Sequence, residues 1–204
     1  MADWLNRADL AAVVPDFIAM TEAQISRRLL MDGPVRPMMG RAQDFSIDAE
    51  FVNVPSDFMG IRAIWAASGD TPGGIFPLEI ATPDEINDLK AFHANGDTGT
   101  IKRFAVVGTT LQFWPWNGTT VSSELTYWQR VPALSANPAG NWLLTLHPDA
   151  YLYGALLQAA PYLKDDARVA MWAEMFQTVL SDIVAADRIE RSAAQIAMPP
   201  RPTA

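Results

Sequence analysis

The sequence predicts an α+β protein in which helices from both chain ends bracket a β-rich insertion. Apolar residues recur at helical spacing near the N-terminus and in the last third of the chain. Between these regions the pattern changes to alternation and to short apolar runs bounded by turn residues, which is typical of strands. We therefore expect a discontinuous helical bundle domain over residues 1–43 and 141–191, and an antiparallel insertion resembling a β-sandwich or barrel over 44–140. An extended tail is expected over 192–204, because Met-Pro-Pro-Arg-Pro near its end cannot be helical.

The first long helix is expected to begin at Pro15. Proline is tolerated at the first helical position, where its missing N–H would be unpaired in any case. A short helical lead-in is expected before it, over residues 3–12. Gly33 and Pro34 end the long helix. Its apolar side consists of Phe17, Ile18, Ile25 and Leu29.

The insertion is expected to contain one short helix among its strands. Thr82 and Glu85 form a capping-box pattern that predicts a helix up to about Phe92. Gly108-Thr109 and Asn117-Gly118 are expected turns, and the second pair favours a tight hairpin. The last three strands should therefore run antiparallel to one another. The expected extended segments are 45–51, 60–66, 75–80, 101–107, 111–116 and 121–128.

Two further helices are expected between Asn141 and Arg191. Pro148 suits the first position of one helix, and Pro161 kinks or ends it. Asp165-Asp166 should open the other helix, because negative charge is favoured at a helix N-terminus. Joined by a short link, the two helices should form an antiparallel hairpin. The stripe of the second helix is Val169, Trp172, Phe176, Val179, Leu180 and Ile183.

Composition narrows the possible classes of protein. The 204 residues are half hydrophobic, which is enough for a sizeable core. The formal net charge of −8 argues against non-specific nucleic-acid binding, since neutralising phosphates requires clustered basic residues. The chain has no cysteine, and hence no disulfide. We expect no membrane partner, because no uninterrupted apolar run has the length of a transmembrane helix and the N-terminus lacks a signal-peptide pattern.

Few residues suggest chemistry. Asp48 and Glu50 are expected to share one face of a strand, where a carboxylate pair could bind a cation or act as acid and base. A solvated strand face is the simpler interpretation. His93 and His147 have no partner at metal-ligand spacing. The sequence therefore predicts no catalytic residue, no metal site and no cofactor, with a small carboxylate-dependent hydrolase as an alternative.

The aromatic run Phe113-Trp114-Pro115-Trp116 is the most unusual surface candidate. Such rings could stack on sugars or anchor a partner protein, although strand aromatics also pack into a core. A sugar-binding tail accessory protein that uses Trp114 and Trp116 is therefore a second alternative.

Several stretches resemble the head-to-tail adaptors of tailed phages, the connector group that includes gatekeepers and tail tubular protein A. The resemblance is carried by Asn-Trp-Leu-Leu at 141–144, by His-Pro-Asp-Ala-Tyr-Leu-Tyr-Gly-Ala-Leu-Leu at 147–157, and by the stretch 159–176. Residues 10–30 and 54–58 are also similar to that group. The resemblance covers most of the chain and rests on core and turn residues rather than on a catalytic signature.

This resemblance implies a structural virion protein that is synthesised in the cytoplasm of a bacterial host. Twelve copies would form a ring that docks on the portal, extends the DNA channel and attaches tail or nozzle proteins, while DNA only passes through. The tail over 192–204 would reach along the portal. The implied portal or subunit interface consists of Trp142, Tyr151, Tyr153, Arg188, Arg191, Ile196 and Met198. Trp114 and Trp116 would face the tail.

Overall fold

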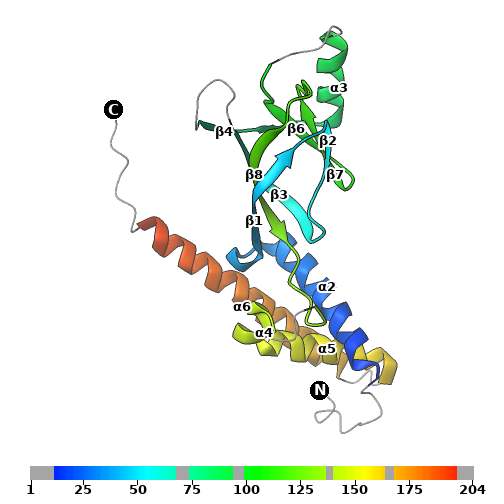
Figure 1. Cartoon of the computed structure of the whole chain (residues 1–204). Coiled ribbons are helices and arrows are strands. Elements are labelled where there is room, and N and C mark those ends of the chain that lie inside the picture. The colour runs from blue at the N-terminus through cyan, green and yellow to red at the C-terminus, as the bar shows by residue number, and fades with distance from the viewer. Residues whose placement is uncertain (1–11, 68–73, 94–98, 137–139, 164–167, 197–204) are drawn as a thin grey trace. The chain divides into compact units, whose positions relative to one another are not determined.

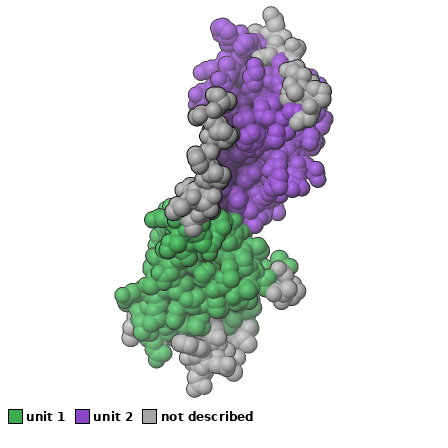
Figure 2. All heavy atoms as spheres, turned by 90° about the vertical axis from the view of Figure 1, so that its left-hand side faces the viewer, with its two compact units in different colours: residues 1–38, 130–204 green, residues 39–129 purple. Residues whose placement is uncertain are grey.

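The computed structural model describes residues 12–67, 74–93, 99–136, 140–163 and 168–196 (Figure 1). These residues form five α-helices and two β-sheets, so the mixed α+β class predicted from the sequence is confirmed. The chain divides into two compact units, which are coloured separately in Figure 2. Unit 1 comprises Met1–Met38 and Arg130–Ala204, and unit 2 comprises Met39–Gln129.

The boundaries of the units differ from those expected at 43/44 and 140/141. Strand β1 begins at Met39, before the alternating apolar pattern is visible, and strand β8 ends at Gln129. The chain therefore enters unit 2 at the first residue of one strand and leaves it at the last residue of another.

Unit 1 is helical in its described part. Helix α2 carries Pro15 in its first turn and ends at Gly33, whose N–H donates to the Leu29 carbonyl oxygen at 3.2 Å. Both of these predicted helix ends are confirmed, whereas residues 1–11, with most of the expected lead-in helix, lie outside the described residues. The elements are α2 (Val14–Asp32), the 3-10 helix η2 (Arg36–Met38), α4 (Trp142–Leu146), α5 (Pro148–Leu163) and α6 (Val169–Ile196).

The helices of the last third differ from the expectation in three places. The short helix α4 was not predicted, and the Asn141 side chain caps it by accepting from the Leu144 N–H at 2.8 Å. Pro161 lies inside α5, which continues to Leu163. Helix α6 continues past Arg191 to Ile196, so the prediction of extended structure from residue 192 is wrong up to that point. Asp165-Asp166 lies outside the described residues.

Helix α5 packs against both α2 and α6 (Figure 1). The three helices meet at Gly154, where a Cβ atom would lie 2.9 Å from Phe176 Cε2 and closer still to Thr21 Cγ2. Only glycine permits this approach. The largest buried side chains of the unit include Ile25, Leu29, Met38, Leu143, Leu156, Trp172, Phe176 and Leu180.

By length and composition, residues Val169–Ser192 of α6 are apolar enough to cross a membrane, with a mean hydropathy of 1.2. In unit 1, however, Trp172 and Phe176 of this helix are buried in the core. The apolar character of α6 thus comes partly from a stripe that packs inside the protein, and partly from a second, exposed face.

Unit 2 contains two four-stranded sheets and helix α3. One sheet has the strand order β1-β8-β3-β4, and the other has the order β2-β7-β6-β5. All pairs are antiparallel except β5 with β6. The strands are β1 (Met39–Ile47), β2 (Phe51–Asn53), β3 (Phe58–Ala67), β4 (Ile75–Pro77), β5 (Glu79–Ile80), β6 (Arg103–Val107), β7 (Thr110–Trp114) and β8 (Val121–Gln129).

The two sheets share one hydrophobic core. Its buried residues come from both sheets: Ile47, Ile64, Ala66, Leu78, Ile101, Phe104, Leu111, Phe113, Leu125 and Tyr127. Helix α3 (Pro83–Phe92) has one buried residue, Ile86, and its predicted capping box is confirmed. In that box the Thr82 N–H donates to Glu85 Oε2 at 2.7 Å, and the Glu85 N–H donates to Thr82 Oγ1 at 3.2 Å.

The expected hairpin between the last two strands is wrong. Strand β7 pairs with β6 and β2, whereas β8 pairs with β1 and β3 in the other sheet. The chain bends at Gly118, which has φ 82°, but this segment carries the chain from one sheet to the other. Each edge of β8 pairs with a strand that is distant in sequence, and the local turn signal does not identify these partners.

A glycine substitution should test the close approach of the three helices. We expect Gly154→Ala to lower the stability of unit 1 by roughly 1–3 kcal/mol, because overpacking against Thr21 and Phe176 exceeds the gain in helix propensity. Urea unfolding followed by tryptophan fluorescence would measure the loss. Gly60→Ala, in strand β3 of unit 2, is the control for adding a methyl group where there is room, since its Cβ would meet Trp128 Cδ1 at an ordinary 3.7 Å. A Gly154→Ala protein as stable as the wild type would contradict the proposed packing constraint.

Candidate functional site

Trp142, a predicted interface residue, lines a cavity of about 90 Å³ in unit 1. Helix α4 supplies Trp142 and Leu146 to this cavity, and α6 supplies Ile183. The Trp142 indole N–H is buried and has no hydrogen-bond acceptor among the described residues. A buried donor without an acceptor is unfavourable, and a cavity of this size has room for a few water molecules.

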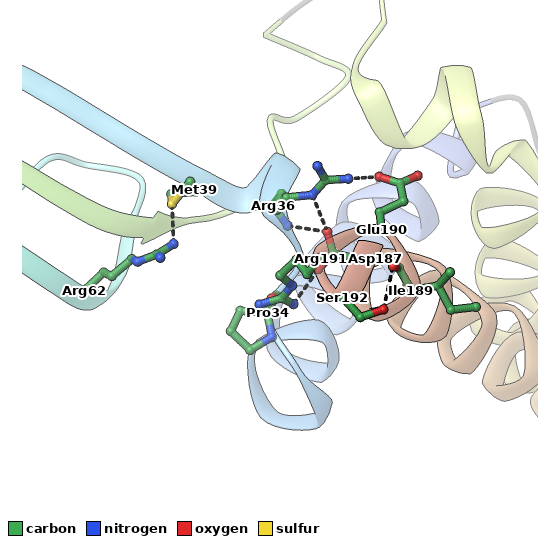
Figure 3. A network of polar contacts seen from close by, with 9 residues as sticks. All are labelled: Pro34, Arg36, Met39, Arg62, Asp187, Ile189, Glu190, Arg191 and Ser192. Carbon is green, nitrogen blue, oxygen red and sulfur yellow. Dashed lines mark hydrogen bonds and ion pairs between the residues drawn. The ribbon is translucent and has the colours of Figure 1, made fainter. Parts of the chain in front are cut away.

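A polar network borders the same cavity and joins α6 to the segment after α2 (Figure 3). The Arg36 backbone N–H and Nε both donate to Asp187 Oδ1, at 3.0 and 3.1 Å. Arg191 pairs with the same carboxylate and also donates to the Pro34 carbonyl oxygen at 2.9 Å. Glu190 pairs with Arg36 on the exposed side. The network thus attaches the segment that follows α2 to the last turns of α6.

Asp187 is only 6% exposed and remains charged because of its partners. Burial alone would raise the pKa of its carboxyl group, but the hydrogen bonds from Arg36 and the charge of Arg191 outweigh burial, and the pKa is lowered. Arg191, predicted as an interface residue, is therefore already engaged within its own unit.

Tyr151, another predicted interface residue, is buried inside unit 1. Its hydroxyl donates to Glu22 Oε1 at 3.1 Å and accepts from Asn141 Nδ2 at 2.7 Å. Burial and the nearby Glu22 carboxylate raise the pKa of Tyr151, while the Asn141 hydrogen bond opposes this shift. Tyr151 stabilises the fold and does not offer a surface to a partner, so we leave it out of the proposed interface.

The remaining predicted interface residues do not converge on the Trp142 cavity. Tyr153 is half-buried and lines a groove between α5 and α6, whereas Arg188 lines a separate hollow with Asp32. Ile196 is the last residue of α6, and Met198 lies outside the described residues. The groove also contains Met171 and Met175, to which the sequence pattern gave no role. Their offset of one position from the core residues Trp172 and Phe176 is the signal that would have placed them on the adjacent, exposed face.

In unit 2, Trp114 belongs to a cluster that surrounds Lys90. The Lys90 ammonium lies 5.7 Å from the Phe51 ring centroid and 5.9 Å from that of Trp114. The same ammonium pairs with Glu50, which also accepts from Gln112 Nε2 at 3.1 Å. Trp116, in contrast, is half-buried and packs against the core. The two predicted tail-facing residues therefore do not form one aromatic surface.

The carboxylate pair suggested by the sequence is also not present as expected. Asp48 and Glu50 lie in the connection between β1 and β2, so the prediction that they share one strand face is wrong. Because Glu50 is paired with Lys90, it is occupied by a cation of its own chain. Among the described residues, no group of three or more His, Cys, Asp or Glu side chains could hold a metal ion.

We expect Asp187→Asn to lower the stability of unit 1 by roughly 1–3 kcal/mol, because Arg36 and Arg191 lose a charged acceptor. Asp182→Asn, at an exposed position of the same helix, is the matched control. A lowered pKa stabilises the folded state above the unfolded value of about 3.9. The difference between wild type and Asp187→Asn should therefore shrink as the pH falls below about 4 in urea unfolding. A difference that stays constant down to pH 2 would contradict this role.

The sequence matches the family model described as SU10 adaptor protein over residues 1–199. A comparison with curated proteins gave no match. The family match includes the helices of unit 1 and the whole of unit 2. The chain therefore belongs to the SU10 adaptor protein family, a family of phage head-to-tail adaptors.

Proposed function

We propose that twelve copies of this chain assemble side by side as a ring that docks on the portal of a tailed phage. The ring extends the DNA channel and offers a surface to tail or nozzle proteins. The match of the adaptor family to residues 1–199 carries this proposal. It makes the chain a structural component of the virion that contacts other phage head and tail proteins.

The charge of the chain is compatible with a DNA conduit. A formal net charge of −8 disfavours strong binding to phosphates, so DNA can pass a ring of such subunits without being held. A protein that gripped DNA electrostatically would carry clustered lysine and arginine instead.

Exposed apolar residues of the unit 1 helices support subunit contacts through this unit. Met20 and Met31 of α2 and Met171 and Met175 of α6 all keep more than a third of their surface exposed. Methionine is enriched at protein interfaces and adapts to irregular partner surfaces. In the proposed assembly, unit 2 faces the tail or the outside, and residues 197–204 reach along the portal.

The two alternatives from the sequence lose support from the side-chain contacts. Lys90 lies beside the Trp114 ring, where a sugar would have to stack, and Trp116 contributes to the core. Glu50 is paired with Lys90 and does not share a strand face with Asp48. Neither a sugar-binding site nor a carboxylate-dependent hydrolase is therefore proposed.

The ring proposal is tested by mixing the protein with purified portal and imaging it by negative-stain electron microscopy. We expect an added ring of density on one face of the portal. Deletion of residues 197–204 should weaken portal binding while unit 1 remains folded, because α6 ends at Ile196. A protein that stays monomeric and leaves the portal unchanged would overturn the proposal. Equal portal binding by the shortened chain would remove the role given to the C-terminal residues.

A further inference from the structure

We propose that the groove between α5 and α6 receives the outer face of α2 from a neighbouring copy of the chain. This inference rests on the proposed ring and identifies the two surfaces that would build it. The helix groove consists of Asp149, Tyr153, Met171, Glu174, Met175, Thr178 and Val179. The α2 stripe consists of Met20, Ala23, Arg27 and Met31.

The helix groove has an apolar floor and an acidic rim. It encloses about 500 Å³, and within it Met171 is 46% exposed and Met175 is 39% exposed. Asp149 and Glu174, both exposed, are its charged residues, and none of the described residues that line it is basic. Grooves of this kind accept the apolar face of an amphipathic helix.

The α2 stripe has the complementary composition. Met20, Arg27 and Met31 follow one another at helical spacing and point away from the buried side of α2, which is marked by Ile25 and Leu29. Met20 is 54% exposed and Met31 is 78% exposed. The stripe thus offers two apolar side chains with a guanidinium between them.

The dimensions of the two surfaces are similar. From Met20 to Met31 the α2 stripe extends about 16 Å, at 1.5 Å per residue. The α6 side of the groove, from Met171 to Val179, extends about 12 Å by the same measure. One face of α2 can therefore cover the groove along its length and place Arg27 near Glu174 or Asp149.

Charge favours a contact between the unlike surfaces, groove against stripe, over a contact between two like surfaces. A groove facing a second groove would bring Asp149 and Glu174 against the same carboxylates, and a stripe facing a second stripe would bring two copies of Arg27 together. Only the groove of one copy against the stripe of the next joins opposite charges. Such heterologous contacts produce a ring when the rotation between neighbours closes.

Cysteine pairs provide a sharp test because the natural chain has no cysteine. Met175→Cys is combined in turn with Met20→Cys, Ala23→Cys and Met31→Cys, and each protein is oxidised alone and with purified portal. A disulfide requires Cα atoms within about 7 Å. We expect at least one pair to give a ladder of covalent oligomers on a non-reducing gel. Met175→Cys with Ala19→Cys is the matched control, since Ala19 is exposed on α2 but lies outside the stripe.

The single variants discriminate between the modes of contact. On the non-reducing gel, Met175→Cys alone and Met20→Cys alone should each run as a monomer. A covalent dimer from either single variant would indicate a two-fold contact and overturn the inference. Rings seen on the portal without any ladder would also overturn it and leave the proposed function standing. A protein that forms neither rings nor ladders would overturn both.

A charge exchange tests the same contact without cysteines. Glu174→Arg and Arg27→Glu should each lower the association constant of one subunit contact by about threefold, as expected for an exposed charge pair, and thereby lower the fraction of protein in rings. The double variant should recover the wild-type fraction, because opposite charges then meet again across the contact. Two single variants without effect, or a double variant as weak as either single one, would contradict the pairing.

Discussion

The close approach of α2, α5 and α6 at Gly154 determines what unit 1 can present to other molecules. Because α5 has no side chain at this position, Thr21 and Phe176 from the flanking helices come into contact with its backbone. Each helix is thereby fixed in its rotation about its own axis. The same constraint that buries Trp172 and Phe176 leaves Met171 and Met175 on the surface.

The Arg36–Asp187 interaction completes this arrangement from a long distance in sequence. It joins residues 151 positions apart and attaches the chain leaving α2 to the last turns of α6. A charged group with so little exposure is stable only when every partner is in place. The network therefore contributes specificity to the arrangement of the two chain ends as well as stability.

Local signals predicted the parts of the fold that depend on neighbouring residues. Pro15 and Gly33 marked the ends of α2, and Thr82 with Glu85 marked the start of α3, because capping requires only residues within one turn. The partners of β8 could not be predicted in this way, since they are determined by a core shared between two sheets. The end of α6 was placed too early because its apolar stripe fades after Ile183, although no glycine or proline lies between Ile183 and Ile196 to break the helix.

The candidate surfaces show the same limit. The sequence gave Trp142, Tyr151 and Tyr153 the same predicted role at an interface, and the structure places Trp142 beside a cavity and Tyr153 in a groove. Only the fold brings Glu22 and Asn141 onto the Tyr151 hydroxyl and makes it a core residue. Likewise, the sequence alone does not show that Glu50 pairs with Lys90, because the helix that carries Lys90 follows forty positions later.

The pairing of β1 with β8 has a consequence for how such a chain can diversify. Met39 lies opposite Trp128 in the register of β1 and β8. Arg62 contacts both residues: it donates to Met39 Sδ at 2.6 Å, and its guanidinium lies 5.6 Å from the Trp128 ring centroid. The entry and exit of unit 2 are therefore adjacent, as the two ends of a removable module must be. A change of length inside residues 39–129 therefore need not move the two points at which the chain joins unit 1.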